Sequence, residues 1–286
     1  MSDTQNRLKA HLEVLIGERH PFSAPNHLLQ VEAYLSEQLT LPGVTVERHR
    51  FEALGETYHN VVATVAAHQQ APPLIVAAHF DTVEQSPGAD DNASGLAALL
   101  EVARLVHGLT LTRPVRFIAF NLEEENLLGS LAYATELRRT GQAILGAIIL
   151  ECVGYARSEP GSQQMPPHVP VEVASVGDFL AVVGNEKSQE LVVAITSSGN
   201  RAVPPLKVIP LVVQGRGEML QDTRRSDHAA FWDQGFPAVM LTDTANFRNP
   251  HYHRPTDTID TLNLTFLSDV TLAITAAVRD LAGQAT

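Results

Sequence analysis

The sequence predicts a single α/β domain in which helices cover both faces of a mixed, mainly parallel sheet. Short apolar strands alternate with amphipathic helices between residues 74 and 150, a pattern typical of βαβ units and a buried parallel sheet. The 286 residues correspond to about 1.9 average domains, but α/β enzymes of this size often form one domain. Since no linker or repeat divides the chain, we expect one catalytic domain over residues 1–286.

The composition excludes several classes of protein. Apolar residues make up 44% and the mean hydropathy is −0.01, as in ordinary globular proteins. The net charge of −12 argues against nucleic acid and against an anionic membrane as partners. No apolar run approaches the about 18 residues of a membrane span, and we see no signal peptide at the N-terminus. With Cys152 as the single cysteine, no intrachain disulfide is possible, and we expect a cytoplasmic enzyme of open oligomeric state.

The first part of the chain predicts two helices and a hairpin. Apolar residues recur at helical spacing over 4–16 and 26–39. Two β-rich stretches, 44–51 and 58–66, are joined through Leu54-Gly55-Glu56 as a hairpin.

The remaining elements follow from the alternation and from the segments after it. Apolar runs predict strands at 74–78, 115–120, 143–150, 179–183, 208–213 and 238–242. Helical spacing predicts helices at 93–106, 127–139, 189–198 and 265–281. Residues 156–178 contain four prolines and two glycines and predict a long irregular loop. Because such long loops are usually functional, we expect a lid that shapes a pocket together with loop 244–252.

Polar side chains stand where the predicted parallel strands end. His79 follows the first strand, Glu123 and Glu124 follow the second, and Glu151 follows the third. Asp91 lies in the first crossover. Ligands of open parallel sheets bind outside the carboxyl ends of the strands, so we expect these groups to converge at one edge. Such polar groups would be costly to bury there without a ligand or metal that compensates them.

The residue types are suited to zinc. Imidazole nitrogen and carboxylate oxygen both bind Zn²⁺, at about 2.0–2.2 Å, and His253 supplies a second imidazole. Charge counting favours two ions, because their four positive charges are balanced by Asp91, Glu124, Glu151 and one bridging hydroxide. Glu123 is then left over, and a free carboxylate beside a metal-bound water is the natural general base.

Some of these residues also have an ordinary structural interpretation. His79 alone is compatible with a hydrogen-bonded histidine at a strand end, and Asp91 with a helix N-cap. The acidic residues 123–125 are compatible with an exposed first turn that the helix dipole favours, an interpretation that suits Glu125 best. The combination of all these motifs favours the metal site.

Four motifs resemble the co-catalytic zinc aminopeptidase family, which includes bacterial leucyl aminopeptidases. Its superfamily also contains glutamate carboxypeptidase, glutaminyl cyclase and the transferrin receptor. The motifs are His79-Phe80-Asp81, residues 88–95 (GADDNASG), residues 123–130 (EEENLLGS) and Tyr252-His253 with Asp257-Thr258. They occur in order from about Val76 to Thr258, and together they are specific although each alone is weak.

The resemblance implies a role for each site residue. Asp91 would bridge two zinc ions, with His79 and Glu151 completing one site and Glu124 and His253 the other. Glu123 would act as general base, Asp81 would orient His79, and Tyr252 would stabilise the oxyanion. The family usually has Asp at the position of Glu151. The segment Ser226-Asp227-His228 also resembles a family segment near the site, without an assigned role.

The implied function is zinc-dependent hydrolysis of the N-terminal peptide bond of peptide substrates. A glutaminyl cyclase with one zinc remains an alternative on the same scaffold. A carboxypeptidase remains another, with Arg224 or Arg225 as the cation for a substrate carboxylate. The third is a non-catalytic interaction module, against which the complete ligand set argues.

Overall fold

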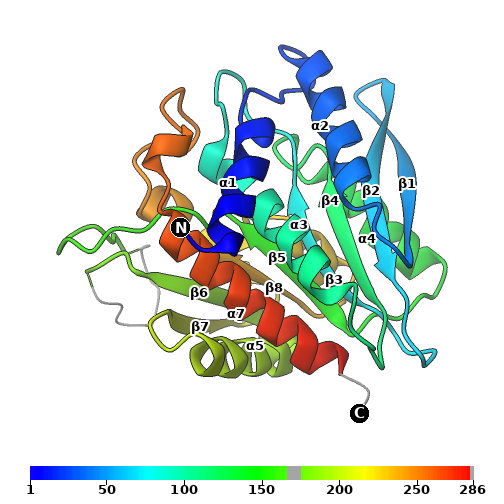
Figure 1. Cartoon of the computed structure of the whole chain (residues 1–286). Helices are drawn as coiled ribbons and strands as arrows, with labels where there is room; N and C mark the ends of the chain where they lie inside the picture. The colour runs from blue at the N-terminus through cyan, green and yellow to red at the C-terminus, as the bar shows by residue number, and fades with distance from the viewer. Residues whose placement is uncertain (166–174, 284–286) are drawn as a thin grey trace.

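An eight-stranded sheet forms the centre of the computed structural model, which describes residues 1–165 and 175–283 (Figure 1). In chain order the strands are β1 (Val44–Ala53), β2 (Glu56–Val65), β3 (Leu74–His79), β4 (Val115–Phe120), β5 (Gly146–Glu151), β6 (Phe179–Asn185), β7 (Lys207–Val213) and β8 (Ala238–Thr242). Their order in the sheet is β1-β2-β4-β3-β5-β8-β6-β7. The four central strands β4, β3, β5 and β8 are parallel, whereas β2 and β6 run antiparallel to their central neighbours. The predicted α/β class with a mixed, mainly parallel sheet is confirmed.

Helices cover both faces of this sheet. In chain order they are α1 (Asp3–Leu15), α2 (Pro25–Gln38), the π-helical segment η1 (Ala89–Ser94), α3 (Gly95–Val106), α4 (Leu128–Arg139), η2 (Glu186–Ser188), α5 (Gln189–Ala202), η3 (Gln221–Arg224), α6 (His228–Asp233), η4 (Ala245–Phe247), η5 (Ile259–Thr261) and α7 (Leu264–Ala282). A reciprocal capping box between Ser2 and Gln5 starts α1, and the Asn263 side chain caps α7.

The two faces of the sheet carry separate apolar cores. On one face α1, α3, α5 and α7 pack side by side, and their buried side chains include Leu12, Leu99 and Ile274 (Figure 1). On the other face α4 packs over β1 and β2, and α6 packs over β5 and β8. Beyond α6 this second face continues across β6 and β7.

The predicted elements are present with small shifts at their ends. Residues 93 and 94, predicted to be helical, belong to η1 instead, and the strand predicted from 143 begins at Gly146. The helix α6 was missed because six residues are too few to show helical periodicity. Of the predicted loop 156–178, residues 156–165 and 175–178 are irregular as expected, and 166–174 lie outside the described residues. Within the described ranges, no helix combines the length and apolarity needed to cross a bilayer.

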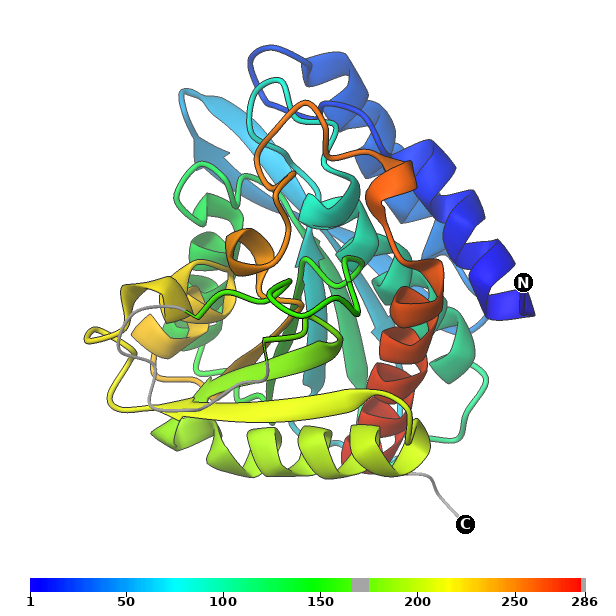
Figure 2. The ribbon, with the colours of Figure 1, turned by 90° about the vertical axis from the view of Figure 1, so that its left-hand side faces the viewer.

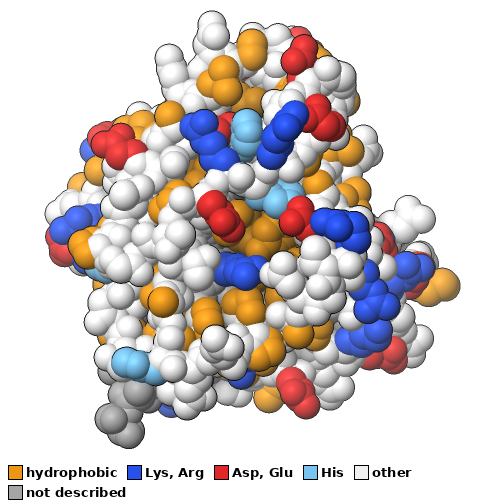
Figure 3. Space-filling view, turned by 90° about the vertical axis from the view of Figure 1, so that its right-hand side faces the viewer, with side chains coloured by type: hydrophobic (Ala, Val, Ile, Leu, Met, Phe, Trp, Pro, Cys, Tyr) orange, Lys and Arg blue, Asp and Glu red, His pale blue; other side chains and the backbone are white. Residues whose placement is uncertain are grey.

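Strand β1 forms one edge of the sheet. It pairs with β2 through a two-residue turn, Leu54 and Gly55, both with positive φ as such tight turns require. Charged side chains along the strand are exposed, and Arg48 pairs with Glu32 of α2. Figure 3 views the molecule from the side on which β1 lies in Figure 1, and its cationic and anionic side chains are interspersed. Such charges discourage the addition of another strand.

Arg19 anchors the segment after α1 to the loop that precedes η1. Its side chain is inaccessible to solvent. The guanidinium donates hydrogen bonds of 2.6–3.1 Å to the backbone carbonyls of Leu15, Gly17, Phe80, Pro87 and Gly88. Gly88 has φ +62°, and a Cβ there would lie 2.7 Å from Arg19 Nη2, so the contact requires glycine. Burial lowers the pKa of Arg19 to about 10, which still leaves it charged at neutral pH.

We predict that Arg19→Met destabilises the fold strongly. The substitution leaves several buried carbonyls without a donor, so the free energy of unfolding should fall by at least about 3 kcal/mol. Urea denaturation followed by circular dichroism measures this loss. The matched control is Arg7→Met, because Arg7 is exposed on α1 and pairs with Asp3, a contact worth at most about 0.5 kcal/mol. Equal losses in both variants would contradict the anchoring role.

Candidate metal centre

The predicted ligands converge at the carboxyl ends of the parallel strands. Figure 2 shows this edge of the sheet, with η1 and the orange segment between β8 and α7 close together above the strands. The cluster consists of His79 at the end of β3, Asp91 in η1, Glu123 and Glu124 after β4, Glu151 at the end of β5 and His253 between β8 and α7. All six residues come from the sequence prediction.

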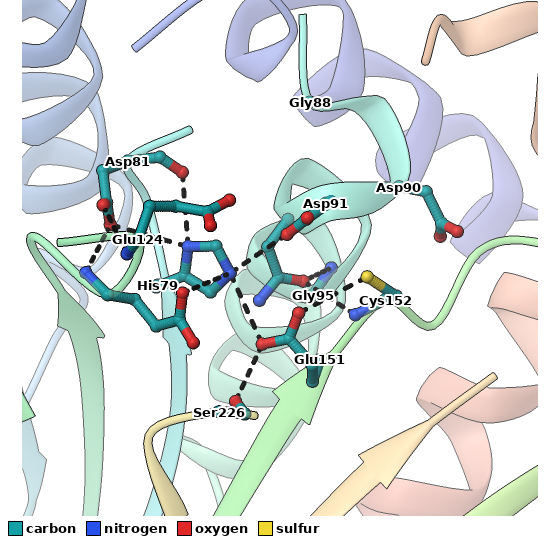
Figure 4. Close-up of polar contacts among 12 residues, drawn as sticks. His79, Asp81, Gly88, Asp90, Asp91, Gly95, Glu124, Glu151, Cys152 and Ser226 are labelled. Atoms are coloured by element: carbon teal, nitrogen blue, oxygen red, sulfur yellow. Dashed lines mark hydrogen bonds and ion pairs between the residues drawn. The ribbon is translucent and has the colours of Figure 1, made fainter. Parts of the chain in front are cut away.

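The carboxylate of Asp91 lies between the two imidazoles. Its Oδ1 is 3.2 Å from His79 Nε2, and its Oδ2 is 3.0 Å from His253 Nε2. Glu151 Oε2 lies 3.4 Å from the same nitrogen of His79 (Figure 4), and Glu124 Oε2 lies 3.4 Å from that of His253. Two ligand atoms bound tetrahedrally to one zinc at about 2.0–2.1 Å are about 3.3 Å apart. The observed separations therefore fit two zinc sites that share Asp91.

Several buried atoms of the cluster have no hydrogen-bond partner in the described structure. His79 Nε2, both carboxylate oxygens of Asp91 and Glu124 Oε1 are buried and make no hydrogen bond with any described residue. A buried polar atom without a partner is costly, and a cation shared by these atoms would remove that cost. The donor set of two imidazoles and three carboxylates therefore fits zinc, with the roles of these residues as ligands remaining a prediction.

Cys152 lies next to this cluster, close enough to Asp91 and Glu151 for the three residues to share a metal ion. Its Sγ donates to Glu151 Oε1 at 3.4 Å, and the residue is inaccessible to solvent. Burial raises the pKa of the thiol well above its usual range, and the surrounding carboxylates add to the rise. In the absence of metal Cys152 is therefore a buried, protonated thiol beside the cluster.

Asp81 connects two parts of the cluster. Its backbone carbonyl lies 3.2 Å from His79 Nδ1 and its Oδ1 lies 3.5 Å from the same nitrogen, consistent with the orienting role that the family resemblance implies. The same carboxylate also accepts the backbone N–H groups of Glu123 at 2.9 Å and Glu124 at 3.0 Å. One buried residue, through its carbonyl and its carboxylate, therefore holds an imidazole and the backbone that carries two carboxylates. The second part of this role was not foreseen from the sequence.

Two further positioning residues were missed in the sequence. Asp257 is buried and accepts the backbone N–H groups of Asp90 and Asp91 at 3.0–3.2 Å, which holds η1 in place. Ser226 Oγ donates to Glu151 Oε2 at 2.8 Å and orients it toward His79 (Figure 4). Both stood in segments that resembled the family, but their spacing gave no indication of their partners. Glu151 is one methylene longer than the Asp that the family usually has at this position. With the hydrogen bond from Ser226 its carboxylate still reaches the cluster.

Glu123 faces the cluster without being one of its closest members. Its Oε2 is 4.0 Å from His79 Nε2, and the side chain is 9% exposed. Burial raises the pKa of Glu123 well above its usual range; His79 opposes the rise, whereas Glu151 and Glu124 add to it. A carboxylate whose pKa is raised in this way is a stronger base than an ordinary one.

Tyr252 lies flat against a predicted ligand. Its ring stacks on the His253 ring with centroids 3.9 Å apart and planes at 16°. Burial raises the pKa of Tyr252, and Asp91 and other nearby acidic groups add to this, so the hydroxyl keeps its proton. It is therefore a hydrogen-bond donor at the edge of the cluster.

A pocket of about 250 Å³ opens beside the cluster. Glu151 and Tyr252 are among its lining residues, as are Gln163 and Phe247 of the predicted lid and loop. Its apolar wall is formed by Phe179, Ala181 and Val183 of β6, Ile209 and Leu211 of β7 and Met240 of β8. This is the part of the second sheet face that lies beyond α6. The predicted lid residues 166–174 lie outside the described residues.

The two candidate cations differ in their placement. Arg224 donates to both carboxylate oxygens of Asp233 at 2.9 and 3.1 Å and to the Arg216 carbonyl. Arg225 instead lines the pocket. Of this pair, only Arg225 is positioned to meet a substrate.

Residues 60–278 match the sequence profile of peptidase family M28. The uncharacterized protein YfbL of Escherichia coli is 34% identical over 92% of this chain and 84% of its own length. The solved structure of BSAP, a zinc aminopeptidase from Bacillus subtilis, is 25% identical with a TM-score of 0.64, over 81% of this chain and 52% of that protein. A glutaminyl cyclase from Porphyromonas gingivalis shares the fold at 18% identity, with a TM-score of 0.71 over 97% of this chain and 96% of its own.

We predict that zinc binding to the metal-free protein releases protons. Burial lowers the pKa of His253, but the facing carboxylates of Asp91 and Glu124 raise it to about 10, whereas burial raises the pKa of Glu124 to about 7. Both groups must be deprotonated to bind zinc, so at pH 7 His253 releases one proton and Glu124 part of another. The apparent affinity should therefore rise with pH.

Titration calorimetry in two buffers of different ionisation enthalpy measures the protons released. Glu124→Gln should release fewer protons and bind zinc more weakly, because a neutral amide replaces a charged ligand. Zinc binding that is independent of pH between 6 and 8 would contradict this assignment of ligands.

Proposed function

This chain belongs to peptidase family M28, and from that premise we propose that it is a zinc-dependent aminopeptidase that removes N-terminal residues from peptides. The observation that carries the proposal is the Asp91 carboxylate shared by two imidazoles, with Glu123 beside it as an uncommitted carboxylate. The similarity to a zinc aminopeptidase supports the activity, although this chain spans only 52% of that protein.

The residues that would hold zinc are His79, Asp91, Glu124, Glu151 and His253. When bound, zinc would polarise the scissile carbonyl and acidify the attacking water. Glu123 accepts the proton of that water and passes it to the leaving amine, a transfer for which its raised pKa is suited. The Tyr252 hydroxyl donates a hydrogen bond to the oxyanion that develops on the carbonyl oxygen.

The charge around the pocket favours a substrate with a free amino terminus. The protein carries a net charge of −12, and Glu123 remains beside the cluster beyond the carboxylates that zinc would balance. This field attracts a substrate ammonium and repels a carboxylate. The apolar wall of the pocket suits an uncharged aliphatic or aromatic side chain on the residue to be removed.

One observation favours a carboxypeptidase as the second candidate. Arg225 lines the pocket next to Tyr252, and a guanidinium pairs well with a carboxylate. A glutaminyl cyclase is the third candidate, because the fold is shared with one. The three activities require different ends of the substrate and are separated by a peptide panel.

We predict that Glu123→Gln retains the fold and zinc but loses turnover. The amide has nearly the size of the carboxylate but cannot accept a proton at neutral pH, so kcat should fall by about 10²–10⁴-fold. Peptide cleavage followed by chromatography measures the loss, and metal analysis verifies the zinc content. Glu125→Gln is the control: Glu125 is partly exposed and lies 3.5 Å from His20, so its loss should leave kcat near that of the wild type. An active, zinc-loaded Glu123→Gln variant would show that the base is another group.

We predict cleavage of short peptides with an apolar first residue and a free N-terminus. Acetylation of the N-terminus should abolish cleavage, because it removes the ammonium that the acidic site attracts, whereas C-terminal amidation should be tolerated. Mass spectrometry of the products identifies the bond that breaks. The reverse pattern would identify a carboxypeptidase. Loss of ammonia from an N-terminal glutaminyl peptide without chain cleavage would identify a cyclase.

A further inference from the structure

The Tyr252 hydroxyl is held by a side chain that has so far been considered only as a partner for a substrate carboxylate. Arg225 Nη2 donates to Tyr252 Oη at 3.2 Å. We infer that Arg225 is a positioning residue for the reaction, which holds the Tyr252 hydroxyl so that its proton is directed to the oxyanion. The inference rests on the proposed peptidase function of the site.

The guanidinium of Arg225 is itself fixed. Its Nη1 donates to Asn246 Oδ1 at 3.0 Å and lies 3.7 Å from Asp222 Oδ1. Its Cζ lies 5.5 Å from the centroid of the Tyr252 ring, within cation–π range. Arg225 therefore connects the segments on both sides of the pocket, η3 and η4, to the tyrosine between them.

The chemistry of the two groups determines which one provides the proton. A tyrosine hydroxyl has one proton to donate and lone pairs to accept with, whereas an arginine has only donors. Next to Arg225, Tyr252 Oη must be the acceptor, and its own proton is left for a different partner. Stacking on His253 fixes the ring but leaves the hydroxyl proton free to rotate about the C–O bond. The contact with Arg225 removes this freedom and aligns the donor before the substrate arrives.

A rival explanation gives Arg225 a direct contact with substrate. Its side chain is 44% exposed, so a substrate carboxylate could also reach it. The two explanations differ in what they predict. Positioning of Tyr252 acts on kcat and requires the tyrosine hydroxyl, whereas binding of a carboxylate acts on KM and requires a free C-terminus on the substrate.

A double-mutant cycle on a C-amidated peptide with a free N-terminus tests the inference. The four proteins are the wild type, Arg225→Met, Tyr252→Phe and the double variant. Arg225→Met should lower kcat by about tenfold, the effect of a lost hydrogen bond to a charged group, with KM little changed. In the Tyr252→Phe background the same substitution should have no further effect, because the hydroxyl it positions is absent.

Additional measurements exclude a purely structural effect. Arg225→Lys keeps a charged donor and should recover part of kcat. Arg224→Met, next in sequence but bonded to Asp233 outside the pocket, should retain wild-type kcat. An aminoalkyl boronic acid, which mimics the tetrahedral state, should bind Arg225→Met more weakly by the same factor as the loss of kcat. Zinc content and the midpoint of thermal unfolding should match the wild type in all variants.

The possible outcomes separate this inference from the proposed function. Losses that add in the double variant would overturn the positioning role. So would a loss confined to KM that appears only with a free C-terminal carboxylate. A wild type that cleaves no peptide of the panel would overturn the proposed function and the inference together.

Discussion

The buried carboxylate of Asp81 is the contact on which the geometry of the cluster depends. It joins the end of β3 to the segment after β4, because it faces the His79 ring and accepts two backbone N–H groups of the neighbouring segment. Asp257 does the same for η1 from the far end of the chain. In both cases the ligands are positioned by carboxylates that do not themselves face the proposed ions. Second-layer carboxylates of this kind fix the direction of a ligand before it binds.

Burying several acidic side chains close together costs electrostatic free energy, and the surrounding structure offsets part of this cost. Asp81, Asp91 and Asp257 are almost inaccessible to solvent, as is the cationic Arg19 beside them. The charge of Arg19 is opposed by burial but supported by these same carboxylates. The guanidinium nevertheless donates to backbone carbonyls, so it stabilises the loops and leaves the carboxylates free for other partners. A direct ion pair with Asp91 would have occupied atoms that the proposed zinc ions need.

The sequence predicted those parts of the site that depend on local pattern. Each parallel strand is a continuous apolar run with a polar residue at its end, so His79 and Glu151 could be placed at one edge of the sheet without a structure. The anchoring role of Arg19 could not be predicted, because its partners are backbone carbonyls that any residue could supply. The partners of Asp257 are also backbone groups, the N–H donors of Asp90 and Asp91, and the helix α6 is shorter than the window in which periodicity is visible. What the sequence does not contain is which distant segments exchange hydrogen bonds.

Contacts between residues this far apart in the sequence determine when the cluster assembles during synthesis. Arg19 reaches Gly88 across 69 positions, and Asp257 reaches Asp90 across 167. During synthesis the segment with His79 and Asp91 emerges well before the segment with His253 and Asp257. Because contacts this distant close late in folding, the cluster is incomplete until nearly all of the sheet has formed. A nascent chain or an early fragment would thus carry the acidic side chains of the cluster without an assembled centre.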